Sequence, residues 1–289
     1  MSEIYKNYGY TPDREAIDRS LEIIASNLEN VISETVLKDC FSFMDLTSLH
    51  NADTVASITK LMEKVNSYRE TYPEFPLPAS VCVYPNLVNV VAESRKDKEL
   101  HATAVAGCFP TSQSFIEIKT RECELAVEAG ADEIDIVLNV GAFLDGDYES
   151  VCDEITEQKH SAGDSILKVI LETGALKSAQ AIRDASVLSL YSDADFLKTS
   201  TGKEYPGATL EAAYVMAQCI KEYYEKTGKR VGFKASGGVA TTEEAVQYYT
   251  VIKTVLGEEW LDNHYFRIGA SRLANNLLSD ILGTPTKFF

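Results

Sequence analysis

Short apolar runs rich in β-branched residues alternate along the chain with longer segments in which apolar and polar positions recur at helical spacing. The short runs are almost continuously apolar, which is typical of parallel strands that helices cover on both faces. We therefore predict eight strands, at residues 40–47, 80–85, 101–109, 133–140, 167–173, 195–201, 231–237 and 265–271.

The segments between the predicted strands carry helix signals. Two show apolar stripes at helical spacing: residues 53–70, with Val55, Ile58, Met62 and Val65, and residues 112–130, with Phe115, Ile118, Cys123 and Leu125. Residues 241–256 open with Thr241 and Glu244 in a capping-box pattern. Residues 209–227 end at Gly228, which is a common helix stop.

This strand–helix alternation favours a (β/α)8 barrel, the TIM-barrel class of α/β fold. A doubly wound open sheet is the alternative, but eight units in a chain of 289 residues fit a closed barrel better. The sequence contains no low-complexity linker, so we expect residues 1–289 to form a single domain.

An additional N-terminal helical extension is predicted at residues 11–38. Thr11 is the candidate cap, and Pro12 occupies the first helical position, where its missing N–H has no partner to lose. An apolar stripe follows that could cover the bottom of the barrel: Ile17, Leu21, Ile24 and Leu28.

The composition of the chain limits the partners and the location that we expect for it. A formal net charge of −17 argues against nucleic acid or an anionic membrane as a partner, although a local basic pocket can still bind a small anion. The chain has no apolar leader and no apolar run long enough to cross a bilayer. Its six cysteines include no C-x-x-C pair, so we expect buried free thiols and a cytoplasmic location.

Cofactor signals are weak. The four histidines have no paired spacing, so we predict no metal site. No G-x-G-x-x-G follows the first predicted strand, so a dinucleotide site has no support either. We therefore expect a protein that works without a cofactor.

Two lysines stand out within the predicted strands. Lys198 is the fourth residue of the strand at 195–201, and Lys234 is the fourth residue of the strand at 231–237. If these strands are neighbours with matched starts, the two amines lie close together, because adjacent strands are about 4.8 Å apart. Burial and a nearby like charge both lower the pKa of a lysine. The pair is thus suited to making one neutral amine, which attacks carbonyl groups and forms a Schiff base.

Polar residues and glycines also lie within the predicted strands or just after them, toward the end at which the active sites of such barrels lie. Loops after the last two strands of a barrel commonly hold phosphate through backbone N–H groups and a helix N-terminus. The candidate residues in these places are Asp45, Asp135, Thr201, Gly202, Lys203, Gly237, Gly238, Gly269, Ser271 and Arg272. Taken singly, each glycine could be an ordinary turn and each polar residue a cap.

These segments together resemble the deoxyribose-phosphate aldolases, which are class I, Schiff-base aldolases on a (β/α)8 barrel. The resemblance runs from about Phe41 to Leu278. It rests on MDLTSL (44–49), SVCVYP (80–85), GADEIDIVLN (130–139), LKVILETG (167–174), ADFLKTSTGK (194–203), VGFKASGGV (231–239) and RIGAS (267–271).

The resemblance implies roles for particular residues. Lys198 matches the Schiff-base lysine, Lys234 the second lysine that lowers its pKa, and Asp135 the aspartate that works with it in proton transfer. Asp45 and Thr47 match positions close to the substrate. The phosphate-binding region matches Gly202, Lys203, Gly237, Gly238 and Ser271.

The implied reaction is the reversible, metal-independent cleavage of 2-deoxy-D-ribose 5-phosphate to glyceraldehyde 3-phosphate and acetaldehyde. A sugar phosphate is then the small-molecule partner, and a homodimer is possible. Two alternatives stay open. One is a different Schiff-base barrel enzyme, such as a transaldolase-like or ketose aldolase. The other is a non-catalytic barrel that binds sugar phosphates, which would not need a neutral amine.

The chain departs from the family pattern at several positions. It ends in Phe289 rather than tyrosine, and His50 stands where some relatives have asparagine. Ala240 stands where some relatives have arginine, whereas Arg272 follows Ser271 where a second serine is frequent. We add Arg272 as a phosphate ligand specific to this chain, with a solvent-facing helix start as its alternative.

Cys82, in the second predicted strand, is a further substrate-site candidate. If it faces the barrel mouth, it could attack an unsaturated aldehyde bound as the Schiff base. The alternative is a small residue that packs in the core.

Overall fold

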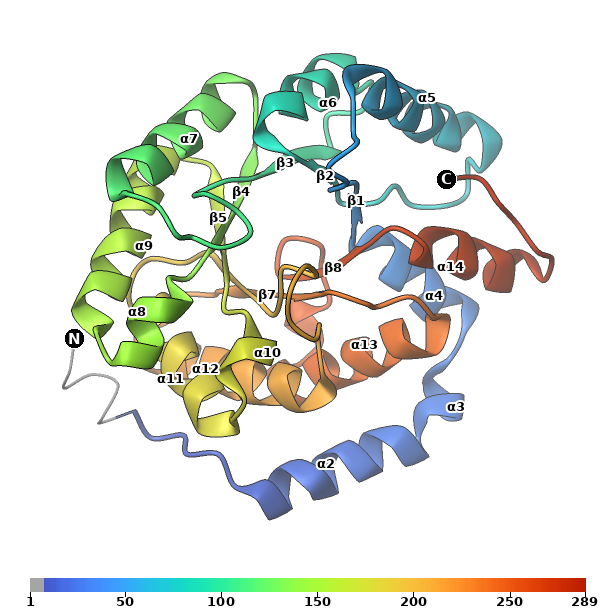
Figure 1. Cartoon of the computed structure of the whole chain (residues 1–289). Coiled ribbons are helices and arrows are strands. Elements are labelled where there is room, and N and C mark those ends of the chain that lie inside the picture. Colours follow the sequence, from blue (N-terminus) through green and yellow to red (C-terminus); the bar gives the residue numbers. More distant parts are fainter. Residues whose placement is uncertain (1–7) are drawn as a thin grey trace.

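The computed structural model describes residues 8–289 of the chain. Eight parallel strands form a closed barrel in chain order, with β8 paired to β1 (Figure 1). Their bounds are β1 Met44–Thr47, β2 Ser80–Val83, β3 His101–Val105, β4 Glu133–Val137, β5 Ile166–Ile170, β6 Phe196–Lys198, β7 Gly232–Ser236 and β8 Phe266–Ala270. The predicted (β/α)8 barrel is confirmed.

Helices surround the barrel. They are α5 Val55–Thr71, α6 Val88–Ser94, α7 Ile116–Glu128, α8 Val140–Asp145, α9 Tyr148–Ala162, α10 Thr173–Leu176, α11 Ala179–Leu190, α12 Leu210–Thr227, α13 Thr242–Leu256 and α14 Leu273–Leu282, with short 3-10 turns at Pro85–Leu87 and Glu258–Trp260. The capping box of Thr241 and Glu244 opens α13 as predicted. Gly228 ends α12 in a left-handed conformation with φ 71°.

The first predicted strand starts too early. Residues 40–42 belong instead to the end of α4 (Glu34–Ser42), which begins where the Ser33 side chain accepts from the backbone N–H of Val36. Leu37, Cys40 and Phe41 form the buried face of this helix. A short apolar run has no period that would separate a helix end from a strand start, so the sequence could not place the boundary.

The apolar stripe predicted for α7 is wrong at three of its four positions. Phe115, Ile118 and Leu125 are 79%, 54% and 49% exposed. The helix buries Cys123, as predicted, together with Lys119 and Ala126. The buried face of α7 includes a lysine because the Lys119 ammonium pairs with Glu154 at 2.7 Å, and such a pairing cannot be seen in a hydropathy pattern.

The N-terminal extension contains α2 (Arg14–Ser26) and α3 (Leu28–Val31) before α4. Asp13, not Thr11, caps α2, and its side chain accepts from the backbone N–H of Glu15. Figure 1 shows α2 outside the ring of helices, where it contacts α12 and α13 rather than the bottom of the barrel. Ile17 and Ile24 bury its apolar face in the hydrophobic core. A largely exposed ion pair of 2.8 Å between Arg14 and Glu211 adds a contact to α12.

The C-terminal tail folds back onto α4 and α5. The rings of Phe288 and Phe289 pack against Tyr68, and Phe289 also packs against Phe41. The Asn275 side chain accepts from the backbone N–H groups of both terminal residues, at 2.7 and 3.0 Å. The tail therefore extends the hydrophobic core.

Deleting Phe288 and Phe289 should lower stability. Both rings are half-buried, so we expect a loss of about 2 kcal/mol and a fall in Tm of about 4 °C. Thermal unfolding of the truncated and full-length chains measures this, with the exposed Lys287→Ala variant as the control. An unchanged Tm on truncation would show that the tail does not contribute to the core.

None of the helices among residues 8–289 combines the length and apolarity needed to cross a membrane.

Candidate active site

Seven charged side chains fill the interior of the barrel and are almost fully buried. Strand residues point alternately into and out of a barrel, and these seven point inward from six of the strands. They are Asp45, Glu133, Asp135, Lys168, Lys198, Lys234 and Arg267, called the charge cluster below.

The two lysines singled out in the sequence meet within this cluster. Lys198 and Lys234 are direct register partners on the neighbouring strands β6 and β7. Their Nζ atoms lie 2.6 and 2.7 Å from the same Oδ2 atom of Asp135. Asp135 therefore links the two amines, and its other oxygen accepts from Lys168 at 2.8 Å.

The rest of the cluster lies beneath this pair. Asp45 contacts Lys234 at 2.5 Å and Arg267 at 2.6 Å. Glu133 contacts Lys168 at 2.5 Å and Arg267 at 2.7 Å. Each of the three carboxylates thus bridges at least two basic groups, which offsets the cost of burying it.

The pKa values of the two lysines are shifted in opposite directions. Burial, which disfavours an ammonium, lowers the pKa of Lys198; Asp135 opposes this effect and the charge of Lys234 adds to it. Burial acts in the same direction on Lys234, but Asp135 and Asp45 outweigh it and raise the pKa of that lysine. Burial alone would raise the pKa of Asp135, but the surrounding lysines hold it well below its usual range.

The number of charges in the cluster also favours a neutral Lys198. With every group ionised, the four basic residues Lys168, Lys198, Lys234 and Arg267 exceed the three carboxylates by one positive charge. An unbalanced charge is costly in a buried site. Loss of one proton from Lys198, the lysine with the lowered pKa, balances the cluster.

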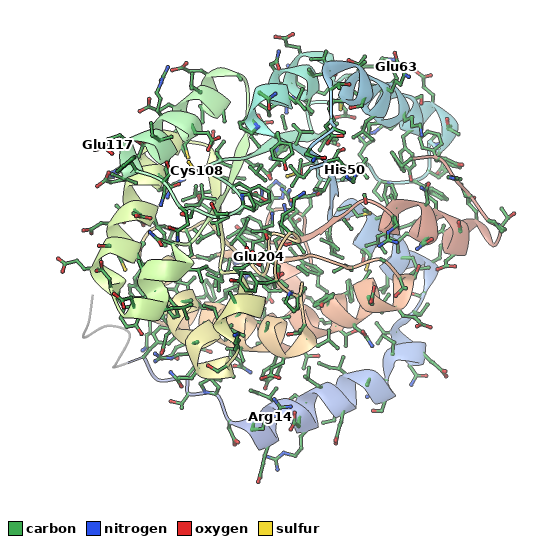
Figure 2. The ribbon with its side chains drawn as sticks, viewed as in Figure 1. Arg14, His50, Glu63, Cys108, Glu117 and Glu204 are labelled. Carbon is green, nitrogen blue, oxygen red and sulfur yellow. The ribbon has the colours of Figure 1, made fainter. Side chains whose placement is uncertain are left out.

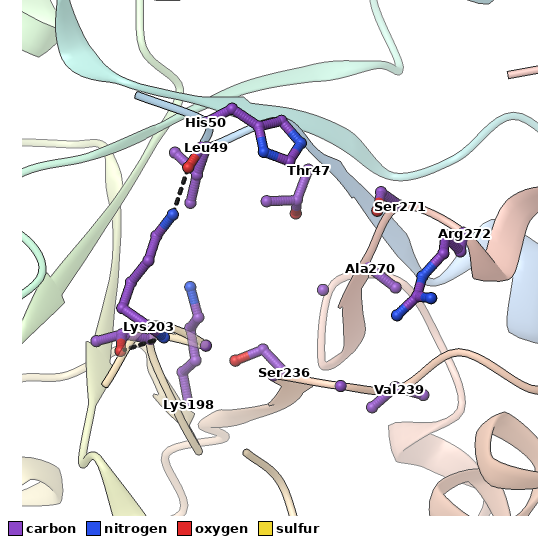
Figure 3. Close-up of a pocket in the computed structure, with 15 residues that line it drawn as sticks. Thr47, Leu49, His50, Lys198, Lys203, Ser236, Val239, Ala270, Ser271 and Arg272 are labelled. Atoms are coloured by element: carbon purple, nitrogen blue, oxygen red, sulfur yellow. Dashed lines mark hydrogen bonds between the residues drawn. The ribbon is translucent and has the colours of Figure 1, made fainter. Parts of the chain in front are cut away.

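A cavity of about 210 Å³ opens above the cluster (Figure 3). It is lined by Thr47, Leu49, His50, Lys198, Thr201, Gly202, Lys203, Ser236, Gly237, Gly238, Val239, Gly269, Ala270, Ser271 and Arg272. Figure 2 looks onto this end of the barrel, with His50 and Glu204 near its centre and Arg14 and Glu63 on the periphery. The loops after β1, β6, β7 and β8 therefore form the cavity walls.

Two glycines allow the loops after β6 and β7 to approach one another. A Cβ atom at Gly207 would lie 1.7 Å from the carbonyl oxygen of Gly237. Gly237 itself has a φ of 85°, which side-chain-bearing residues rarely adopt. Larger residues at either position would push the two loops apart and widen the cavity.

A sequence profile of the DeoC/LacD family aldolases matches residues 41–255. The chain belongs to this aldolase family. It is therefore an enzyme, an aldolase of the lyase class.

Individual relatives agree with this family. Mouse deoxyribose-phosphate aldolase is 38% identical over 255 residues, which cover 83% of this chain and 77% of the mouse protein. A relative from Caenorhabditis elegans is 39% identical over 271 residues, 93% of this chain and 89% of its own. A solved structure from Coccidioides immitis has a TM-score of 0.71 at 26% identity, over 93% of this chain and 98% of its own.

Most of the substrate-site residues expected in this aldolase line the cavity. They are Thr47, Thr201, Gly202, Lys203, Gly237, Gly238, Gly269, Ser271 and Arg272, together with Lys198. Asp45 does not line it; this side chain is fully buried beneath the cavity and contacts Lys234. Asp135 and Lys234 likewise lie within the charge cluster, below the cavity floor.

Cys82 lies outside the cavity lining. Its side chain is fully buried with Leu49 and Val105, against Tyr84 and Phe109. Burial raises the pKa of its thiol to about 11. The structure thus places Cys82 in a small apolar cluster beside the site, with its thiol protonated at neutral pH.

Sequence reasoning did not select several residues that line the cavity: Leu49, Ser236, Val239 and Ala270. Ser236 follows Lys234 by two positions on β7, so the two-residue period of a strand could have identified it. Its hydroxyl donates to the carbonyl of Ser200 at 2.6 Å. Leu49 contributes through its backbone, since its carbonyl accepts from the Lys203 ammonium across the cavity (Figure 3).

Proposed function

We propose that this aldolase reversibly cleaves 2-deoxy-D-ribose 5-phosphate to glyceraldehyde 3-phosphate and acetaldehyde through a Schiff base on Lys198. One observation carries the proposal. Of the seven side chains in the charge cluster, Lys198 alone lines the cavity, and it is the lysine whose pKa is lowered. The lysine of the cluster whose surroundings favour the neutral amine therefore faces the space in which a carbonyl compound would bind.

The reaction begins when the Lys198 nitrogen attacks C1 of the open-chain sugar, and loss of water gives an iminium ion. A base takes the proton of the C3 hydroxyl, and the C2–C3 bond breaks as its electrons move to the iminium. Glyceraldehyde 3-phosphate leaves, and the enamine that stays behind is protonated at its methylene carbon. Water then releases acetaldehyde and restores the amine. The iminium serves as the electron sink in the step that breaks the C2–C3 bond.

Asp135 and Lys234 are proposed to move protons during these steps. Asp135 contacts both amines through one oxygen, so a proton leaving either lysine has an adjacent acceptor. Lys234 is anchored between Asp135 and Asp45, which keep it charged beside Lys198. Its charge favours the neutral form of Lys198 before the Schiff base forms.

The phosphate is proposed to bind among the cavity-lining loops after β6, β7 and β8. Lys203 supplies a flexible positive charge from the loop after β6. Ser271 lies across the cavity from it (Figure 3), and the Gly237–Gly238 backbone also lines the cavity. Backbone N–H groups, a hydroxyl and an ammonium are the donors that phosphate oxygens require. The homodimer and the cytoplasmic location expected from the sequence stay predictions.

Product analysis tests this function. The purified enzyme should release acetaldehyde and glyceraldehyde 3-phosphate from 2-deoxyribose 5-phosphate, at a rate that chelators leave unchanged. Faster cleavage of a ketose phosphate would favour a different Schiff-base aldolase. Binding of the sugar phosphate without turnover would favour a non-catalytic barrel, and a rate restored by added zinc would favour a metal mechanism.

Arg272 should contribute to phosphate binding. It lines the cavity at the start of α14, and a charge-assisted contact to phosphate is worth roughly 1.5–3 kcal/mol. Arg272→Ala should therefore raise the KM for 2-deoxyribose 5-phosphate by about tenfold or more. Cleavage of unphosphorylated 2-deoxyribose should barely change.

The exposed Arg121 of α7 offers a matched control, because it pairs only with Glu124 and Glu128 of its own helix among residues 8–289. Arg121→Ala should change neither substrate's KM. Equal losses on both substrates in Arg272→Ala, or no loss on either, would show that Arg272 does not bind phosphate.

A further inference from the structure

Glu172 is a buried carboxylate beside the active site to which the proposed reaction assigns no role. It lies just past the end of β5 and is only 3% exposed. Its backbone is left-handed, with φ 53° and ψ 57°. A residue with a side chain adopts this conformation at a free-energy cost, so it persists only where other contacts of the residue outweigh that cost.

The side-chain hydrogen bonds of Glu172 go to a single residue. One carboxylate oxygen accepts from the Thr201 hydroxyl at 2.5 Å, and the other accepts from the Thr201 backbone N–H at 3.2 Å. Both donors of Thr201 therefore point toward Glu172. A hydroxyl has one proton, so in this arrangement Thr201 has no donor left for a substrate oxygen, although it lines the cavity.

Thr201 in turn contacts the next residues of its loop. Its hydroxyl oxygen accepts from the backbone N–H of Lys203 at 3.2 Å. Between them, Gly202 adopts a φ of 73° and lies close to Gly237 of the neighbouring loop. Glu172 thus fixes the main chain of Thr201–Lys203, the segment that brings the Lys203 ammonium to the cavity.

Charge alone does not explain a carboxylate at this place. Burial raises the pKa of Glu172, while its bonds to Thr201 and the charge of Lys198 act in the opposite direction. A carboxylate behind a phosphate-binding loop repels the phosphate. The hydrogen bonds of Glu172 to Thr201 point instead to a role in the shape of the loop.

We propose that Glu172 is a positioning residue that holds the Thr201–Lys203 loop in the conformation that binds the substrate's phosphate. This inference rests on the proposed function of the same site. It also changes the role expected of Thr201, which becomes part of the support of the loop rather than a ligand of the substrate.

Steady-state kinetics of Glu172→Ala test the proposal. The KM for 2-deoxyribose 5-phosphate should rise about tenfold or more because the loop loses two hydrogen bonds. The kinetics of unphosphorylated 2-deoxyribose should be nearly unchanged. If the charge of Glu172 were what mattered, its removal would lower the KM for the phosphorylated substrate, so the direction of the change decides between the two roles.

Glu222→Ala is a matched control. This carboxylate also accepts from two neighbouring donors, the backbone N–H groups of Gly9 and Tyr10 at 2.6 and 2.5 Å, but it lies on α12 outside the cavity lining. Its loss should leave both KM values unchanged. If Glu172→Ala does not fold, Glu172→Gln replaces it; one acceptor oxygen is kept, so the KM for the phosphorylated substrate should rise by a smaller factor.

A double-mutant cycle with Thr201→Val shows whether the two residues act as one unit. Thr201→Val should raise the KM less in the Glu172 variant than in the wild type, because the bond between the two side chains is already lost and only the bond to the Lys203 N–H is left to lose. Independent, additive effects, equal losses on both substrates, or an unchanged KM in the Glu172 variant would overturn the proposal.

A separate experiment distinguishes failure of the proposed function from failure of the role of Glu172. Borohydride reduction with acetaldehyde does not involve phosphate, so it should label wild type and Glu172→Ala to the same extent. An unlabelled wild-type enzyme would contradict the Schiff base itself. Labelling of both proteins, with no change in the KM of the variant, would contradict only the role of Glu172.

Discussion

Replacing Lys198 with methionine is expected to lower kcat by at least about 10⁴-fold, because the covalent route through the iminium is lost. Methionine keeps the length of the side chain but provides no amine. The rate of acetaldehyde release from 2-deoxyribose 5-phosphate measures the effect. Retained turnover within tenfold of wild type would show that another group forms the Schiff base.

The same substitution should leave the fold intact. If Lys198 is neutral in the native enzyme, its removal leaves Lys168, Lys234 and Arg267 balanced against the three carboxylates of the charge cluster. Removing Lys168, which is held by Glu133 and Asp135, leaves a negative excess instead. Lys168→Met should therefore lower Tm strongly, whereas Lys198→Met should not.

Comparing these two variants tests the charge count independently of activity. Similar losses of Tm would mean that Lys198 is charged and paired in the native enzyme, as Lys168 is. That result would contradict the neutral amine on which the mechanism depends.

The second large effect is expected for Lys234→Leu, which should lower kcat/KM at pH 7 by about 10²–10³-fold. The charge of Lys234 helps to keep the pKa of Lys198 low. Its loss also frees Asp135 to stabilise the Lys198 ammonium. Both changes raise the pKa of Lys198, so a smaller fraction of that lysine is neutral at pH 7.

The sign of this shift gives a pH test. Because Lys198 reacts when it is unprotonated, a raised pKa moves the rise in kcat/KM to higher pH, and the variant should regain part of its activity in alkaline buffer. Lys234→Arg keeps a positive charge but cannot pass protons, since a guanidinium stays protonated. This variant should also be slow, but its pH profile of kcat/KM should shift less toward high pH. Near-normal turnover of either variant at pH 7 would contradict the paired-lysine account.

Much of the barrel and part of the site could be predicted from the sequence because they depend on local pattern. The strands were found from apolar runs, and counting along two of them placed Lys198 beside Lys234, which the observed register bears out. Residues in the loops after β6 to β8 line one cavity because all parallel strands of a barrel end on the same face.

Other features depend on partners distant in sequence, so pattern could not reveal them. The face that α7 buries is set by Glu154, which pairs with Lys119. The place of α2 is set by its packing against α12 and α13, which lie far from it in the sequence. Cys82 sits in an apolar cluster rather than in the cavity because Leu49 and Val105 come from neighbouring segments of the barrel.

The charge cluster also depends on residues distant in sequence, so its composition could not be predicted. Arg267 opens the RIGAS segment (267–271), but the sequence does not indicate that it joins Asp45 to Glu133 beneath the lysine pair. Its contribution to the charge count appears only once the barrel closes and β8 pairs with β1.

Borohydride trapping tests the central claim most directly. The enzyme is mixed with acetaldehyde, reduced with sodium borohydride, digested and mapped by mass spectrometry. The account predicts a two-carbon adduct on Lys198, and none on that peptide in Lys198→Met. An adduct on Lys234 or Lys168, or no adduct on a lysine of the charge cluster, would contradict it.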